Sequence, residues 1–167
     1  MAIDLAFSTA ACPRWTLQRV AQQAGAWGFD GVELRSTGLG GGLLACDPAL
    51  TDPARVRRLF ADAGVSIVCL SADLDVYQHD PAAGARTTDA LRTYIDMAEA
   101  IGCEAVRVYV LRRWPDQPTE HVFDRVAACV DPIGEQLIDA GVRLLFENAG
   151  AMATSKSWWW LMDRLEH

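Results

Sequence analysis

Apolar runs of strand length recur along the chain at nearly constant spacing. Four of them follow a glycine at the end of a helical pattern, and these glycines, Gly28, Gly64, Gly102 and Gly141, are 36, 38 and 39 positions apart. Such a glycine can close a helix in the left-handed conformation without a Cβ penalty. One step of this size holds one helix, one loop and one strand, which is the βα unit of a parallel sheet.

The runs predict five strands, separated by helices. The expected strands cover residues 3–7, 31–35, 65–71, 104–110 and the run from 141 to 148. Thr16 is expected to cap the first helix, and Asp52 followed by Pro53 the second. Apolar residues from Leu91 to Ile101 mark a third. A helical stretch over 120–139 contains Pro132, which should kink or split it.

Three consecutive tryptophans, Trp158, Trp159 and Trp160, lie in the last expected helix, for which Ser155 or Ser157 is the expected N-cap. Successive residues on a helix are about 100° apart, so the three rings cannot all face one core. We expect one of them at a margin. The rings either pack on the sheet or on a neighbouring subunit, or they form a platform for a ligand.

Charged residues interrupt three of the apolar strands. Glu33, Arg107 and Glu147 should share one face, because side chains alternate along a strand. An open parallel sheet covered on both faces would have nearly unbroken apolar strands. The lumen of a (β/α)8 barrel tolerates such groups near its carboxyl rim, where they can satisfy each other, a metal or a substrate. The pattern therefore favours an α/β protein of the TIM-barrel type.

Two loops carry candidate binding groups. His79 lies in the loop expected over 72–81 and could overhang the strand ends, or it could be a solvated loop residue. The glycine-rich segment 36–42 follows the second strand and could contact a phosphate through its backbone N–H groups. Its spacing matches neither a dinucleotide-binding nor a P-loop pattern, so it can equally be a plain loop.

Composition narrows the classes of partner. The 167 residues are 51% hydrophobic and 22% charged, which is typical of one globular domain. The net charge of −7 disfavours nucleic acid as a partner, because affinity for phosphates comes mostly from clustered Lys and Arg. No segment approaches the roughly 18 apolar residues of a membrane helix, and the first residues lack the pattern of a signal peptide. We therefore expect a cytoplasmic protein with no membrane partner.

The five cysteines form no C-x-x-C pair, which excludes a thiolate zinc site of that type.

Several short motifs, in this order, resemble those of the xylose isomerase-like TIM barrels, the sugar phosphate isomerase/epimerase superfamily. They are Phe7-Ser-Thr, Trp15-Thr-Leu17, Gly28-Phe-Asp-Gly-Val-Glu-Leu-Arg35, Ala98-Glu-Ala-Ile-Gly102 with Val106-Arg-Val108, and Gly141-Val-Arg-Leu-Leu-Phe-Glu-Asn148. The resemblance extends over essentially the whole chain. It implies a divalent metal, Mn²⁺, Mg²⁺, Co²⁺ or Zn²⁺, with Glu147 as its first ligand and as a catalytic proton-transfer residue beside a carbonyl.

By the same resemblance Glu33 and Arg107 are candidate substrate-binding residues for a sugar or a sugar phosphate. His79 is a further candidate substrate-binding residue because of its place in the loop. The alternative for Glu33 and Arg107 is a buried ion pair that braces the barrel. Ala149 stands where many relatives have a histidine. Ser71-Ala72 and Tyr109-Val110 stand where the DNA-repair endonuclease branch has histidine ligands, which weakens a nuclease interpretation.

Length limits the functional hypothesis. A full barrel takes roughly 250 residues, and the pattern gives five strands over residues 1–167, so we expect a single partial TIM-barrel domain without strands six to eight. The main hypothesis is a metal-dependent sugar or sugar phosphate isomerase or epimerase, inactive as this partial chain. The alternatives are a dehydratase or lyase on the same scaffold, or a noncatalytic assembly module that pairs its open edge in a homo-oligomer.

Overall fold

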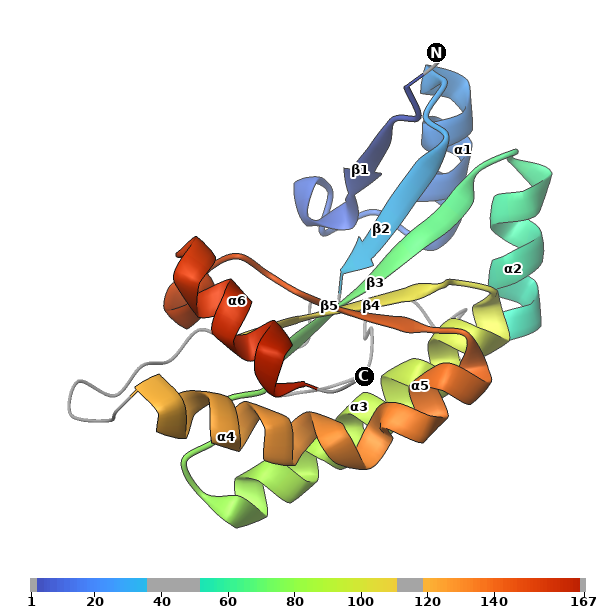
Figure 1. Ribbon diagram of the computed structural model, residues 1–167. Helices are drawn as coiled ribbons and strands as arrows, with labels where there is room; N and C mark the ends of the chain where they lie inside the picture. Colours follow the sequence, from blue (N-terminus) through green and yellow to red (C-terminus); the bar gives the residue numbers. More distant parts are fainter. Residues whose placement is uncertain (1–2, 36–51, 111–118, 166–167) are drawn as a thin grey trace.

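The computed structural model describes residues 3–35, 52–110 and 119–165. Their five strands form one sheet in the order β1-β2-β3-β4-β5, and all four neighbouring pairs are parallel (Figure 1). The strands are β1 (Ala6–Ser8), β2 (Gly31–Arg35), β3 (Ser66–Asp75), β4 (Ala105–Tyr109) and β5 (Arg143–Phe146). This order, in which each strand pairs with the next in sequence, is that of a TIM barrel and confirms the predicted fold class.

Helices connect the strands and pack along one side of the sheet (Figure 1). The α-helices are α1 (Leu17–Trp27), α2 (Pro53–Asp62), α3 (Pro81–Ile101), α4 (Thr119–Val130), α5 (Gly134–Ala140) and α6 (Ser155–Arg164). The described residues also form three short 3-10 helices, η1 (Thr9–Ala11), η3 (Asp131–Ile133) and η4 (Gly150–Met152). Among the described residues no helix combines the length and the apolar character needed to cross a membrane.

Several predicted helix ends are confirmed. Thr16 and Asp52 accept hydrogen bonds from backbone N–H groups of the first turns of α1 and α2. The four glycines of the repeating pattern all have positive φ, between 63° and 76°. Pro132 lies in η3, which separates α4 from α5, so the expected interruption of that helical stretch is also confirmed.

Other boundaries differ from the sequence-based expectations. The first strand covers Ala6–Ser8 rather than residues 3–7. β3 continues to Asp75, four residues beyond its expected end, because a register shift after Ser71 lets Asp75 pair with Tyr109 of β4. α3 begins at Pro81, ten residues before Leu91, with Asp80 as its N-cap. Thr154 caps the last helix, so the expectation of Ser155 or Ser157 is wrong.

The core lies between the sheet and the helices. Alternate strand residues that face the helices are fully buried, including Val32 and Leu34 of β2 and Val106 and Val108 of β4. The residues between them, Glu33 and Arg107, therefore project from the opposite face of the sheet. The hydrophobic layer thus fixes which face carries the charged groups.

The tryptophans of α6 divide as expected. Trp158 is half-buried and packs edge-to-face on Phe146, with 6.4 Å between ring centroids. Trp160 contacts Phe123 of α4 at 6.3 Å, and Lys156 lies over its ring. Trp159 is 74% exposed and is the ring at the margin.

Close packing of α1 on α2 gives a testable prediction. A Cβ at Gly25 would lie 2.7 Å from the backbone oxygen of Ala63. Gly25→Ala should therefore destabilise the chain, although alanine is favoured over glycine in a helix by about 1 kcal/mol. Gly84→Ala in α3 is the matched control, because only the Cβ of Gln78 lies within reach, at 4.0 Å. Urea unfolding should show a loss of stability for the first and a gain for the second, and a gain for both would contradict the packing.

Candidate functional site

Polar side chains converge on the face of the sheet opposite the helices, towards the carboxyl ends of the strands. At its centre is Arg107 of β4, whose Nη1 forms an ion pair with Oε2 of Glu147, the residue that follows β5. Its Nη2 lies 3.2 Å from Oε1 of Glu33 in β2 and donates a hydrogen bond of 2.7 Å to Oγ of Ser71 in β3. Ser8 of β1 donates a hydrogen bond of 2.6 Å to the same oxygen of Glu33. We call Ser8, Glu33, Ser71, Arg107 and Glu147 the polar cluster.

Regular parallel pairing brings these residues together. Ser8 lies opposite Glu33, and Ser71 lies opposite Arg107, in the registers of their strand pairs. The backbone N–H of Glu147 donates to the carbonyl of Val108, which continues the pairing of β5 with β4 by one residue. The structure thus brings together three of the four predicted site residues, Glu33, Arg107 and Glu147.

The side chains of the cluster are partly shielded from water. The exposed fractions are 17% for Arg107, 21% for Glu33 and 31% for Glu147. Partial burial strengthens electrostatic interactions relative to the surface, and it also makes an unpaired charge costly. Here each carboxylate is paired with the guanidinium, and Glu147 is the more accessible of the two.

His79, the fourth predicted residue, lies in the segment between β3 and α3 and is exposed. It follows the carboxyl end of β3, as expected for a residue near the rim, and its contact with substrate stays a prediction. The glycine-rich segment 36–42 lies outside the described residues.

Two members of the cluster were not predicted as functional residues. Ser8 and Ser71 carry no strong signal in the sequence, because a serine in a strand is common and uncharged. The available signal was positional: Ser71 stands at the expected end of a strand, and the carboxyl ends of parallel strands meet at one rim. Its hydroxyl accepts a hydrogen bond from Arg107 and is fully buried.

A divalent ion needs more ligands than the described residues bring together. No group of three or more His, Cys, Asp or Glu side chains that could hold an ion occurs within residues 3–35, 52–110 and 119–165. Glu147 has the chemistry of one oxygen ligand, but its nearest charged neighbour is a guanidinium. These residues alone therefore do not form a metal centre, and we assign no chemical step to an ion.

Cys69 lies on β3 next to this site. Burial, with smaller contributions from Glu33 and Cys103, raises the pKa of the Cys69 thiol to about 12. The thiol is thus neutral at physiological pH, which is the state expected of a buried structural cysteine.

The raised pKa predicts a dependence of stability on pH. In the unfolded chain the Cys69 thiol ionises near its ordinary pKa of 9.0, whereas in the folded chain it stays protonated until about 12. The free energy of unfolding should therefore fall as the pH rises above about 9. Urea unfolding between about pH 7 and about pH 10 should show a smaller fall for Cys69→Ala than for the unmodified chain. Burial also raises the pKa of the half-buried Cys12 thiol, so Cys12→Ala is the comparison and should keep more of the fall than Cys69→Ala. An unchanged slope in Cys69→Ala would contradict the predicted burial of the thiol.

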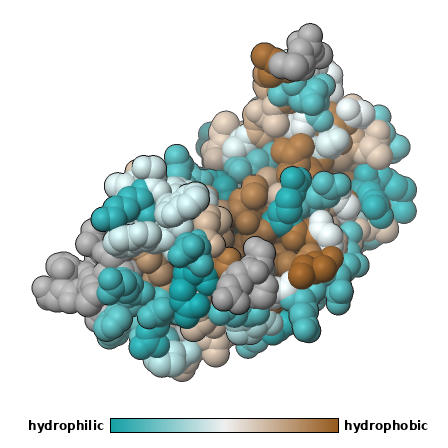
Figure 2. All heavy atoms as spheres, in the orientation of Figure 1, coloured by the Kyte–Doolittle hydropathy of each residue, from teal (hydrophilic) through white to brown (hydrophobic). Residues whose placement is uncertain are grey.

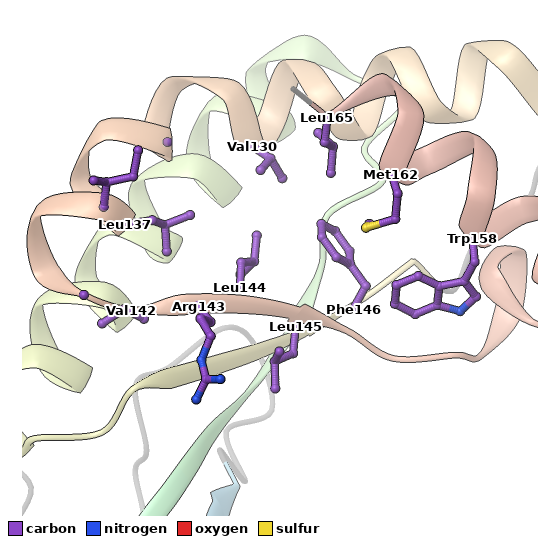
Figure 3. A pocket seen from close by; sticks show the side chains of 13 residues that line it. Val130, Leu137, Val142, Arg143, Leu144, Leu145, Phe146, Trp158, Met162 and Leu165 are labelled. Carbon is purple, nitrogen blue, oxygen red and sulfur yellow. The ribbon is translucent and has the colours of Figure 1, made fainter. Parts of the chain in front are cut away.

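A hollow lies on the other side of β5. It is an apolar groove of about 690 Å³ between β5, α5 and α6. Figure 3 shows Leu144, Phe146, Trp158 and Met162 directed into it, whereas Leu145 points to the opposite side of the strand. The groove therefore belongs to the helix-facing side and does not contain the polar cluster.

Apolar residues also show on the face seen in Figure 2, where they gather over the middle of the sheet. Val68 of β3 and Leu145 of β5 are exposed large apolar side chains of these strands. Val68 lies against the backbone of Gly31, where an added Cβ would be 2.5 Å from its Cγ1. The face that bears the cluster thus combines charged groups with an apolar surface.

A parallel sheet in the order β1-β2-β3-β4-β5, with charged groups towards the carboxyl ends of its strands, is typical of an α/β protein of the TIM-barrel class. Residues 21–167 match the family described as the xylose isomerase-like TIM barrel. The chain belongs to that family, as the sequence motifs predicted. The comparison with curated proteins gives no significant match.

Solved structures share the fold at low sequence identity. The probable 3-DHS dehydratase AsbF from Bacillus anthracis has 16% identity and a TM-score of 0.78, with 99% of this chain and 60% of that chain covered. A D-psicose 3-epimerase solved in the presence of D-fructose has 12% identity and a TM-score of 0.75, with 98% of this chain and 60% of that chain covered. The IolI protein with a zinc atom has 13% identity and a TM-score of 0.79, with 99% of this chain and 60% of that chain covered. The chain thus spans about 60% of the length of these proteins, and at such identity the likeness concerns the fold.

Proposed function

We propose that the chain contributes to a sugar or sugar phosphate isomerase or epimerase, in which Glu147 transfers a proton at a carbon next to a carbonyl. The observation that carries the proposal is the place of Glu147, whose carboxylate projects beyond β5 on the cluster face and is partly accessible. In TIM barrels this rim is where substrates bind. Family membership and the epimerases among the structural neighbours support the choice of reaction.

A carboxylate suits this chemistry when it reaches the reacting C–H bond. Glu147 takes the proton, and the electrons of the C–H bond move towards the carbonyl to give an enediolate. A second acid on the opposite face, which stays unassigned in this proposal, gives a proton to the same carbon to form the epimer, and Glu147 releases its proton to solvent. Return of the proton to the neighbouring carbon, with migration of the hydroxyl proton, gives the isomer. The overall reaction needs neither an oxidant nor a further substrate.

The other groups have positional roles in this proposal. Glu33 and Arg107 line the face on which the substrate would lie, and His79 could reach it from the segment between β3 and α3. The divalent metal implied by the family is part of the proposal, with Glu147 as one of its ligands. A cytoplasmic location and assembly into a homo-oligomer also stay predictions.

The test measures the exchange of hydrogen between solvent and a ketose, catalysed by the polypeptide that the complete coding sequence specifies. D-Fructose and L-ribulose, each with Mn²⁺, Mg²⁺, Co²⁺ or Zn²⁺, should gain deuterium from D₂O next to the carbonyl. Glu147→Gln should lower the exchange rate by at least about 10²-fold, because it removes the base. Glu104→Gln is the matched control, since that carboxylate lies in an exposed ion pair with Arg143. Exchange that survives in Glu147→Gln would exclude the proposed role of Glu147. A product that has lost water would instead identify a dehydratase.

A further inference from the structure

One guanidinium connects residues from all five strands. Nη1 of Arg107 binds Glu147, while Nη2 binds both Glu33 and Ser71, and Glu33 is held in turn by Ser8. Tyr109, on the same face of β4, lies with its ring centroid 5.2 Å from the guanidinium carbon. The orientation of the guanidinium is therefore determined by direct contacts from β2, β3 and β4, with Ser8 of β1 holding Glu33, and Glu147 is bound at its remaining end.

A guanidinium is planar, and its nitrogens keep a fixed geometry. Contacts that hold Nη2 therefore also fix where Nη1 lies. Ser71 contributes strongly to this, because its hydrogen bond to Nη2 is short and its side chain is fully buried. A shift at Ser71 or Glu33 is thus transmitted to Glu147 through the plane of the guanidinium.

Glu147 depends on such a contact more than the other members of the cluster. Its backbone is held by Val108, but its side chain is 31% exposed and has several staggered conformations available. The ion pair with Nη1 selects one of them. Glu33, in contrast, has two partners on one carboxylate oxygen.

We propose that Arg107 is a positioning residue for Glu147, and that Ser71 and Glu33 act on Glu147 only through the Arg107 guanidinium. The proposal rests on the proposed function in one respect, that Glu147 is the residue that moves the proton. In this proposal Arg107 does not bind the substrate directly but acts on it through Glu147. Both terminal nitrogens of Arg107 are already engaged, which supports this choice.

A brace that only holds the strands together would behave differently. Loss of a brace lowers the free energy of unfolding and leaves the Glu147 carboxylate in its place. Loss of a positioning contact moves that carboxylate even in a chain that stays folded. Ser71→Ala separates the two cases, because it removes a hydroxyl with little change of volume and does not alter a charge.

The first experiment uses NMR to measure the chemical shift of the Glu147 side-chain carboxyl carbon in the 167-residue chain. Ser71→Ala should shift the resonance of the Glu147 side-chain carboxyl carbon, although the described contacts of Ser71 reach Arg107 and not Glu147. In the Arg107→Met background the same Ser71→Ala change should cause no further shift. If Arg107→Met does not fold, Arg107→Lys serves, because it keeps the charge but has no rigid planar fork. Arg143→Lys, in the exposed pair with Glu104, is the matched control and should leave the resonance unchanged.

The second experiment measures the rate at which the polypeptide specified by the complete coding sequence exchanges deuterium into a ketose. Ser71→Ala and Arg107→Lys should lower kcat, by up to about 10²-fold for a carboxylate displaced by roughly 1 Å, and leave KM nearly unchanged. An Arg107 that gripped the substrate would instead raise KM.

The outcomes separate this proposal from the proposed function. Glu147→Gln with full exchange activity would exclude the proposed function, while the NMR shifts would still decide the positioning role. A Glu147 carboxyl resonance that does not respond to Ser71→Ala would overturn the positioning role whatever the activity. So would the same shift in the presence and absence of the Arg107 guanidinium. Where Glu147→Gln does abolish exchange, a kcat that stays unchanged in Ser71→Ala and Arg107→Lys would also overturn the positioning role.

Discussion

The contact of the Arg107 guanidinium with two carboxylates is the interaction on which the cluster face of the sheet depends. Removing a charged group from water is costly, and two carboxylates on one face would also repel each other. Arg107 lies between Glu33 and Glu147 and is paired with both. Without this cation, three strands would present uncompensated acidic or polar groups to one partly buried surface.

The apolar layer on the other side of the sheet makes this arrangement possible. Buried residues at alternate positions of β2 and β4 fix the orientation of these strands, so Glu33 and Arg107 cannot turn towards the helices. Two register shifts then adjust the fit, one between Val32 and Glu33 and one after Ser71. Within the described residues the hydrogen bonding of Arg107 is incomplete, because its Nε is buried without a hydrogen-bond partner.

Much of the fold and part of the candidate site could be predicted from the sequence. The strands were recognisable because a glycine and an apolar run repeat, and the convergence of Glu33, Arg107 and Glu147 followed from strict alternation in parallel strands. The sequence could not reveal the extension of β3 to Asp75, since it depends on a register shift against β4. Nor could it reveal Ser8 and Ser71 as partners, because a hydroxyl gains its role only from the neighbours that folding supplies. Thr154 was missed as an N-cap for a related reason: Ser155 and Ser157 are equally suitable residues nearby, and local chemistry does not choose among them.

The charge balance of the cluster also bears on the kind of ligand that can lie beside Glu147. Two carboxylates and one guanidinium leave one excess negative charge among its members, and both terminal nitrogens of Arg107 are engaged. A phosphate placed here would meet this negative field and would have to displace a carboxylate from the guanidinium, which costs free energy in a partly shielded site. A hydroxyl group carries no charge and can both donate and accept, so it can bind a carboxylate oxygen without breaking the ion pairs. On the contacts of the described residues, the electrostatics beside Glu147 therefore favour uncharged hydroxyl and carbonyl groups over a phosphate.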